Sequence, residues 1–204
     1  MPILVPPDWN LLTFAFIAAS VAGFTPGPNN TICMVSSASV GVFRTLPFAW
    51  GVTVGFPFML AAVGFGLGGV LIAHPSLHLV IKIIGALFLL HLAWKIARAR
   101  APIKKTAPQL LGFWQAFFFQ WINPKAIAIA FSLIATYTRP APALFADITY
   151  LMFITTLVSI SATLTWTLFG AGIGRLLKTA KALAIFNGVM GLLLALSIVP
   201  IFLL

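Results

Sequence analysis

Residues 24–30 have the sequence Phe24-Thr25-Pro26-Gly27-Pro28-Asn29-Asn30 and stand inside an apolar stretch, residues 11–39, that is long enough to cross a bilayer. Counted along a helix that begins near Leu11, the motif lies about 22 Å in, deep in the hydrocarbon layer. Proline lacks a backbone donor and clashes with the preceding turn, so two prolines around a glycine open the helical hydrogen-bond ladder. An opened backbone is tolerated in lipid only against protein or beside a wet cavity. The motif therefore predicts a broken transmembrane helix whose break faces the protein interior.

The composition excludes a water-soluble domain with a single apolar core. Apolar residues make up 61% of the 204 residues, charged residues make up 7%, and the mean hydropathy is +1.11. One cysteine, Cys33, can form neither an internal disulfide nor a thiolate cluster, so we expect no metal site, no cofactor and no redox chemistry. The net charge of +10 lies in short loops, which argues against nucleic acid as a partner.

The hydropathy pattern predicts an all-α integral membrane protein with about six transmembrane helices, forming a single transporter domain over residues 1–204. The expected spans are 11–39, 46–72, 77–96, 113–136, 145–173 and 183–204.

The charges predict the orientation of these spans. Nine of the 12 Lys and Arg residues lie in three of the five connections. One is in the first connection, five are in the third and three are in the fifth: Arg44; Lys95, Arg98, Arg100, Lys104 and Lys105; Arg175, Lys178 and Lys181. The positive-inside rule makes these connections cytoplasmic, so both termini are expected on the periplasmic side of a bacterial inner membrane.

A second break is expected in the fourth span, at Gln120-Trp121-Ile122-Asn123-Pro124-Lys125. The two breaks lie early in the two halves of the chain, roughly residues 1–100 and 109–204, and three spans separate them. Halves joined in this way cross the membrane in opposite directions. The pattern therefore predicts a 3+3 inverted repeat in which helices 1 and 4 are interrupted.

Paired breaks at the middle of the membrane provide half-helix ends, and the positive N-terminal end of a helix can hold a carboxylate. The candidate substrate-binding residues are Asn29, Asn30, Asn123 and Lys125, and the residues that break the helices are Pro26, Gly27, Pro28 and Pro124. Lys125 has no Asp or Glu available as a partner within the spans, so we expect a substrate carboxylate to bind it. The alternative is that Lys125 reaches the cytoplasmic mouth and anchors the helix.

Other polar residues in the spans have two interpretations each. Thr155, Ser159, Thr163 and Thr167 recur every four residues and are candidates to line a pathway, although small hydroxyl residues also mediate close packing and bond to their own helix. His91 is a candidate proton carrier or an ordinary hydrogen-bonded histidine. Lys82 is expected to extend its ammonium group to the outer surface, and Asp147 to cap the fifth span.

Three motifs together resemble the LysE/RhtB family of amino-acid exporters: Phe24 to Asn30, Gly41-Val42-Phe43-Arg44, and Phe113-Trp114 leading into Asn123-Pro124-Lys125. The resemblance covers essentially the whole chain. With Leu92-Ala93-Trp94-Lys95-Ile96-Ala97 included, the chain looks most like the branch that exports cysteine and O-acetylserine. The resemblance implies proton-driven export of neutral or basic amino acids across the inner membrane. The absence of Asp and Glu partners within the spans argues against a strongly cationic substrate, so we expect small neutral amino acids or their derivatives. Basic amino acids and substrates of the homoserine and threonine type stay open as alternatives.

Competing functions lack the residues that they need. A membrane enzyme requires a nucleophile with a base, or a metal cluster, whereas the spans offer one cysteine and one deep histidine, so we expect no enzyme. A metal-ion exporter requires carboxylate, thiolate or clustered imidazole ligands. A membrane subunit without transport activity remains as a further alternative. The expected partners are the amino-acid substrate, the lipid bilayer and, as an open question, a second copy in a homodimer.

Reporter fusions test the predicted orientation. A reporter that is active only in the periplasm should stay inactive when fused after Lys105, because the connection before it carries the largest group of positive charges. The same reporter fused after Ser76, in a connection without Lys or Arg, should be active. Activity after Lys105 would reverse the orientation and exchange the two mouths of the pathway.

Overall fold

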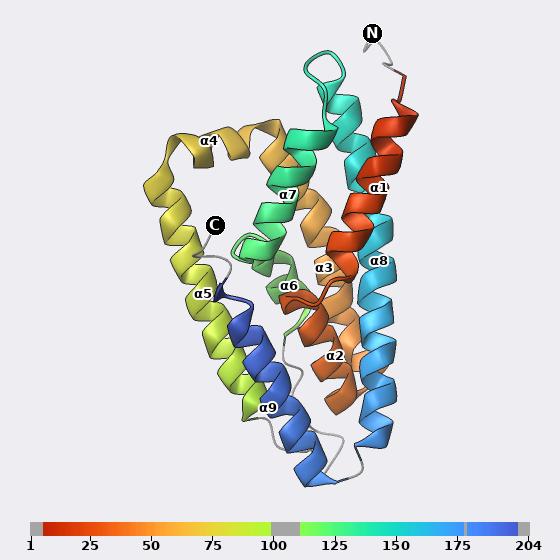
Figure 1. Ribbon diagram of the computed structural model, residues 1–204, viewed down its shortest axis with the longest axis vertical. Coiled ribbons are helices and arrows are strands. Elements are labelled where there is room, and N and C mark those ends of the chain that lie inside the picture. The colour runs from red at the N-terminus through yellow and green to blue at the C-terminus, as the bar shows by residue number, and fades with distance from the viewer. Residues whose placement is uncertain (1–5, 99–110, 178, 200–204) are drawn as a thin grey trace.

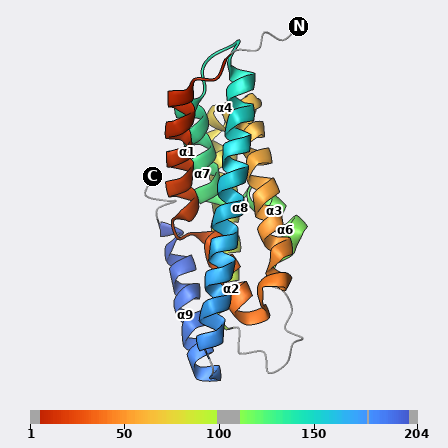
Figure 2. The same cartoon turned by 90° about the vertical axis from the view of Figure 1, so that its right-hand side faces the viewer.

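The computed structural model describes residues 6–98, 111–177 and 179–199, and these ranges are predominantly helical. The elements are α1 (Trp9–Phe24), α2 (Pro28–Val40), α3 (Val42–Ala62), a π-helical turn η1 (Val63–Leu67), α4 (Gly68–Ala73), α5 (Pro75–Ala97), α6 (Phe113–Phe119), α7 (Pro124–Tyr137), α8 (Leu144–Leu176) and α9 (Ala180–Leu196). They form an elongated bundle in which most of the long helices run between the same two ends (Figures 1 and 2). The expected all-α membrane fold is confirmed.

Both predicted interruptions are present in the bundle. The α1 and α2 helices form one apolar pair that bends by 49°, and α6 and α7 form a second pair that bends by 57°. Within the described ranges, three helical stretches are long and apolar enough to cross a membrane unaided, and counting each bent pair as one span brings this number to as many as five. The sixth predicted span begins within α9, an apolar helix of 17 residues that packs along α5, and its last residues lie outside the described part of the chain.

The second predicted span, 46–72, does not continue straight to its end. The helix changes direction at η1, where Gly66 has a φ of 131°, a left-handed conformation that glycine adopts without a steric penalty. As a result α4 lies across the end of the bundle and leads into α5 (Figure 1).

The described basic residues of the three positive connections gather at one end of the bundle. That end holds the start of α3, the ends of α5 and α8, and the start of α9, which carry Arg44, Arg98, Arg175 and Lys181. Arg100, Lys104, Lys105 and Lys178 lie outside the described residues. The opposite end holds the beginning of α1, the α4 segment and the connection from α7 to α8 (Figure 1).

Each broken helix packs on the middle helix of the opposite half. The α8 helix contacts α1 and α2, while α3 contacts α6 and α7; α3 also packs along α8, as α5 does along α9. This exchange of partners is the arrangement that an inverted repeat produces.

Glycines make these contacts close in both halves. On α8, an added Cβ at Gly170 or Gly174 would meet the backbone of α2, at Met34 and Ala38 respectively. On α3, Gly51 and Gly55 lie in the same way against the backbone of α6. Both pairs have the spacing of four residues that places small side chains on one helix face, and such pairs let transmembrane helices approach backbone to backbone.

Alanine substitutions on α8 measure how much the close packing of α8 on α2 contributes to the free energy of unfolding. We expect Gly170→Ala to lower the free energy of unfolding by about 1–3 kcal/mol, because the new methyl group meets a backbone carbonyl that cannot move aside. Gly172→Ala is the matched control, since nothing lies within 4 Å of a Cβ there and the gain in helix propensity is the same. Thermal unfolding of the purified variants in detergent gives the comparison, and equal melting temperatures would contradict close packing at Gly170.

Candidate functional site

The first break is stabilised by a side chain from its own second half. The α1 helix ends at Thr25, Gly27 has an extended backbone, and Pro28 begins α2 at the position where proline's missing N–H costs nothing. Asn30 is buried, and its Nδ2 donates to the carbonyl oxygens of Gly23 at 2.8 Å and Thr25 at 2.9 Å. Carbonyl groups freed by the break thus find partners inside the protein.

The second break repeats this construction. After α6 the chain turns through residues 120–123, and Pro124 occupies the first position of α7. Neither α2 nor α7 has a side chain capping its N-terminus. Both half-helices begin near the middle of the bundle and run toward opposite ends (Figure 1), so two positive helix ends lie in the interior.

Gln120 joins the two breaks, although sequence analysis gave it no role. Asn29 Nδ2 donates to Gln120 Oε1 at 2.9 Å, and Gln120 Nε2 donates back to Asn29 Oδ1 at 3.3 Å and to the Ala116 carbonyl at 2.9 Å. Gln120 is fully buried. Its position directly after three phenylalanines was the available signal, because a buried amide in an apolar run needs a partner.

Lys125 forms a second bridge between the breaks. Its Nζ donates to the Thr25 carbonyl at 3.0 Å, to Thr25 Oγ1 at 2.8 Å and to the Pro26 carbonyl at 3.2 Å. A cation at the C-terminal end of α1 also complements the negative end of the helix dipole. All three ammonium donors are therefore engaged with the first break.

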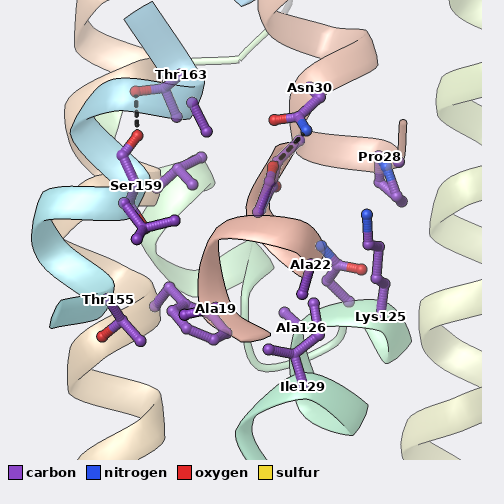
Figure 3. A pocket seen from close by; sticks show the side chains of 18 of the residues that line it. Ala19, Ala22, Pro28, Asn30, Lys125, Ala126, Ile129, Thr155, Ser159 and Thr163 are labelled. Atoms are coloured by element: carbon purple, nitrogen blue, oxygen red, sulfur yellow. Dashed lines mark hydrogen bonds between the residues drawn. The ribbon is translucent and has the colours of Figure 1, made fainter. Parts of the chain in front are cut away.

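An inner cavity of about 70 Å³ lies beside the junction of the breaks, between α1, α3, α7 and α8 (Figure 3). Its polar lining comes from both breaks and from α8: Asn29, Asn30, Asn123, Lys125, Thr155, Ser159 and Thr163. The four candidate substrate-binding residues thus share one cavity with three of the four candidate pathway residues. The fourth, Thr167, is buried further along α8, where its carbonyl accepts a hydrogen bond from Ser37 at 2.6 Å.

The cavity wall is mainly apolar and includes one buried acceptor without a partner among the described residues. Thr155 and Thr163 donate their hydroxyl protons to carbonyls of α8, to Leu151 and Ser159 at 2.7 Å each, so both hydroxyls are bonded to their own helix (Figure 3). Asn123 is buried, and its Oδ1 has no hydrogen-bond partner. A buried acceptor left unpaired at a cavity wall indicates a place for a ligand's donor group.

A larger cavity of about 560 Å³ lies on the other side of the breaks, mainly between α5 and α7. It shares five lining residues with the inner cavity, all in or beside the breaks: Gly27, Pro28, Asn123, Lys125 and Ile129. The two breaks therefore form a partition with Lys125 and Asn123 on both sides.

Other candidates lie outside both cavities. His91 is on the exposed face of α5, beside Trp94. Asp147, expected as a helix cap, instead pairs with Arg139 through two contacts, at 2.6 Å and 2.9 Å, and also accepts from the Arg139 backbone. Among the described residues, no group of three or more His, Cys, Asp or Glu side chains could hold a metal ion.

Two broken helices that meet over an internal cavity define the class of the protein as a membrane transporter. The chain belongs to the family of LysE type translocators, whose family model matches residues 20–199.

Curated relatives are similar over most of the chain. The cysteine/O-acetylserine efflux protein of Salmonella paratyphi A is 30% identical over 142 residues, which are 68% of each chain. The protein of the same description from Klebsiella pneumoniae is 33% identical over 63% of this chain and 64% of its own. That of Shigella flexneri is 28% identical over 98% of both chains. No solved structure matches the chain.

A double-mutant cycle tests the amide pair that joins the breaks. Asn29→Ala and Gln120→Ala should each lower the free energy of unfolding by about 1–3 kcal/mol, because each removes the partner of the other amide, fully buried in Gln120 and partly buried in Asn29. The double variant should lose clearly less than the sum of the two. Unfolding in mixed micelles measures all three variants, and strictly additive losses would show that the two amides do not interact.

Proposed function

We propose that the protein exports small neutral amino acids or close derivatives, of the cysteine and O-acetylserine kind, across the bacterial inner membrane. The names of the relatives support this substrate class. The polar groups of the inner cavity support it independently, because they match the two charged ends of a zwitterion.

One observation carries the proposal: Lys125 stands at the junction of the breaks in a chain whose carboxylates are used elsewhere. The sequence contains two acidic residues. Asp8 caps the N-terminus of α1, accepting from Asn10 and Leu11 at 3.1 Å, and Asp147 pairs with Arg139. A cation held at membrane depth favours an anionic partner, and the carboxylate of an amino acid supplies one. The uncapped starts of α2 and α7 add to this attraction.

The amino group of the substrate would bind an acceptor of the same cavity. Asn123 Oδ1, a buried acceptor without a partner on the cavity wall, can accept one of its protons. The cavity lining includes no carboxylate, so a second positive charge on the substrate would find no counter-ion there. This argues for neutral side chains over basic ones.

Binding a carboxylate requires Lys125 to change partners. Its three donors are engaged with Thr25 and Pro26, so a substrate must replace at least one of these bonds. Substrate would therefore weaken the bridge between the two halves while it binds. A ligand that favours the separated state shifts the equilibrium toward it, which links binding to the exchange of access between the two mouths.

The direction of transport follows from the charge distribution. We place the basic end of the bundle, with Arg44, Arg98 and Arg175, in the cytoplasm, and both termini on the periplasmic side. The proton gradient is the proposed energy source, as the resemblance to LysE/RhtB exporters implies. His91 lies outside both cavities, so we do not assign the coupling proton to it.

Replacing Lys125 tests the binding role. In vesicles containing purified protein, Lys125→Met should reduce export of labelled cysteine at least tenfold, because the charge that holds the carboxylate is lost. Lys125→Arg should retain part of the activity, since it keeps the charge. Lys95→Met is the matched control, as Lys95 is exposed in the last turn of α5.

All variants must elute as folded protein on gel filtration, and normal export by folded Lys125→Met would exclude the binding role. Imposing a pH gradient on wild-type vesicles tests the energy source in the same assay. Export should accelerate when the compartment that receives the amino acid is the more acidic one, and a rate independent of the gradient would exclude proton coupling.

A further inference from the structure

Lys82 lines the larger cavity together with residues of both breaks. The sequence predicted that its ammonium group would reach the outer surface, and it did not predict this cavity. Gly85, about one helical turn further along α5, packs directly against the carbonyl of Ile122 in the second break. Because α5 runs from Pro75 to Ala97, Lys82 lies about one third of the way along the helix, one turn before this contact.

Lys82 has no counter-ion among the described residues. Within the described part of the chain, its ammonium group makes no hydrogen bond or ion pair with the protein. Asp8 and Asp147, the acidic residues of the chain, are engaged at the opposite side of the bundle from α5 and α9, with the α1 terminus and with Arg139. A lysine inside a membrane span is costly without a counter-ion, so a partner from outside the protein is expected.

The position of Lys82 relative to Lys125 suggests what that partner is. Both lysines line the larger cavity, and Lys125 also lines the inner one. The α5 helix begins at the end of the bundle where α1 begins, so Lys82 lies on that side of Gly85 and of the second break (Figure 1). A carboxylate that leaves Lys125 toward this end therefore enters the cavity that Lys82 lines.

We propose that Lys82 forms a second binding station for the substrate carboxylate, on the periplasmic side of the breaks. Ser197 lines the same cavity and donates its hydroxyl proton to the Leu194 carbonyl at 2.7 Å, which leaves its oxygen to accept from an amino group. The station thus repeats the chemistry of the inner cavity, a cation for the carboxylate and an acceptor for the amine. This proposal rests on the proposed function, because it assigns the exit route of the same substrate.

Inhibition from the outer side tests the station. Vesicles with the protein in its cellular orientation are loaded with labelled cysteine, and unlabelled cysteine is added outside. External cysteine should slow export by occupying Lys82. In Lys82→Met, the external concentration for half inhibition should rise roughly tenfold or more, the value of one charge-assisted hydrogen bond. Lys82→Arg and the control Lys95→Met should behave like the wild type.

A second ligand separates the carboxylate from the rest of the substrate. Cysteamine keeps the amine and the thiol of cysteine but lacks the carboxylate. In the wild type, cysteine should inhibit more strongly than cysteamine, and in Lys82→Met this difference should disappear. Equal inhibition curves for wild type and Lys82→Met would overturn the proposal while leaving the proposed function intact. Wild-type vesicles that export no amino acid would instead refute the proposed function.

The phosphate of an anionic lipid is the other anion that could reach Lys82. Repeating the inhibition in vesicles of phosphatidylcholine alone, and in vesicles with added phosphatidylglycerol, separates the two sources. An effect of Lys82→Met that is the same in both membranes supports the substrate station. An effect that occurs only with the anionic lipid would assign Lys82 to a lipid headgroup and overturn it.

Discussion

The need to satisfy opened backbone inside a membrane governs this structure. Pro26, Pro28 and Pro124 interrupt two helices within apolar spans, where lipid cannot replace the lost hydrogen bonds. The protein replaces them with polar side chains from around the breaks: Asn30 bonds the end of α1, and Lys125 reaches across to the same carbonyls. Because Lys125 belongs to the second half and its acceptors to the first, satisfying one break requires the other to lie beside it. The close glycine contacts of α3 and α8 bring the two halves near enough for this.

The same groups that complete the fold are those suited to bind a ligand. A lysine that donates to carbonyls can donate to a carboxylate, and an amide that bridges the halves can release its partner. In the proposed mechanism, stability and transport therefore depend on the same small set of hydrogen bonds. Polar side chains of both halves meet at the partition between the two cavities, while large apolar side chains such as Phe14, Leu87 and Phe153 cover the exterior of the bundle.

The sequence predicted the breaks because proline and glycine disrupt the helix in which they lie. It also predicted which connections lie at the same end of the bundle, because their positive charges can be identified from the sequence alone. Contacts across the bundle were harder to predict. The role of Gln120 depends on Asn29, 91 residues away, and no local pattern pairs them. The place of Lys82 in the larger cavity was not predicted, because it depends on the packing of Gly85 on Ile122, a tertiary contact. The bend at Gly66 was missed because the apolar pattern of the second span continues through it.

Gly27 packs so closely against Lys125 that a substitution at either position restricts which residues the other position can hold. A Cβ at residue 27 would lie 2.8 Å from the Lys125 Cδ and 2.9 Å from its Nζ. The side chain of a lysine is flexible enough to retreat, but in retreating it would leave the carbonyls of the first break. Across the history of such a protein, an alanine or serine at position 27 should survive only alongside a shorter donor at position 125, or alongside a new residue elsewhere that takes over the abandoned carbonyls. A glycine with no chemistry of its own thereby restricts which cation evolution can place at the centre of the transporter.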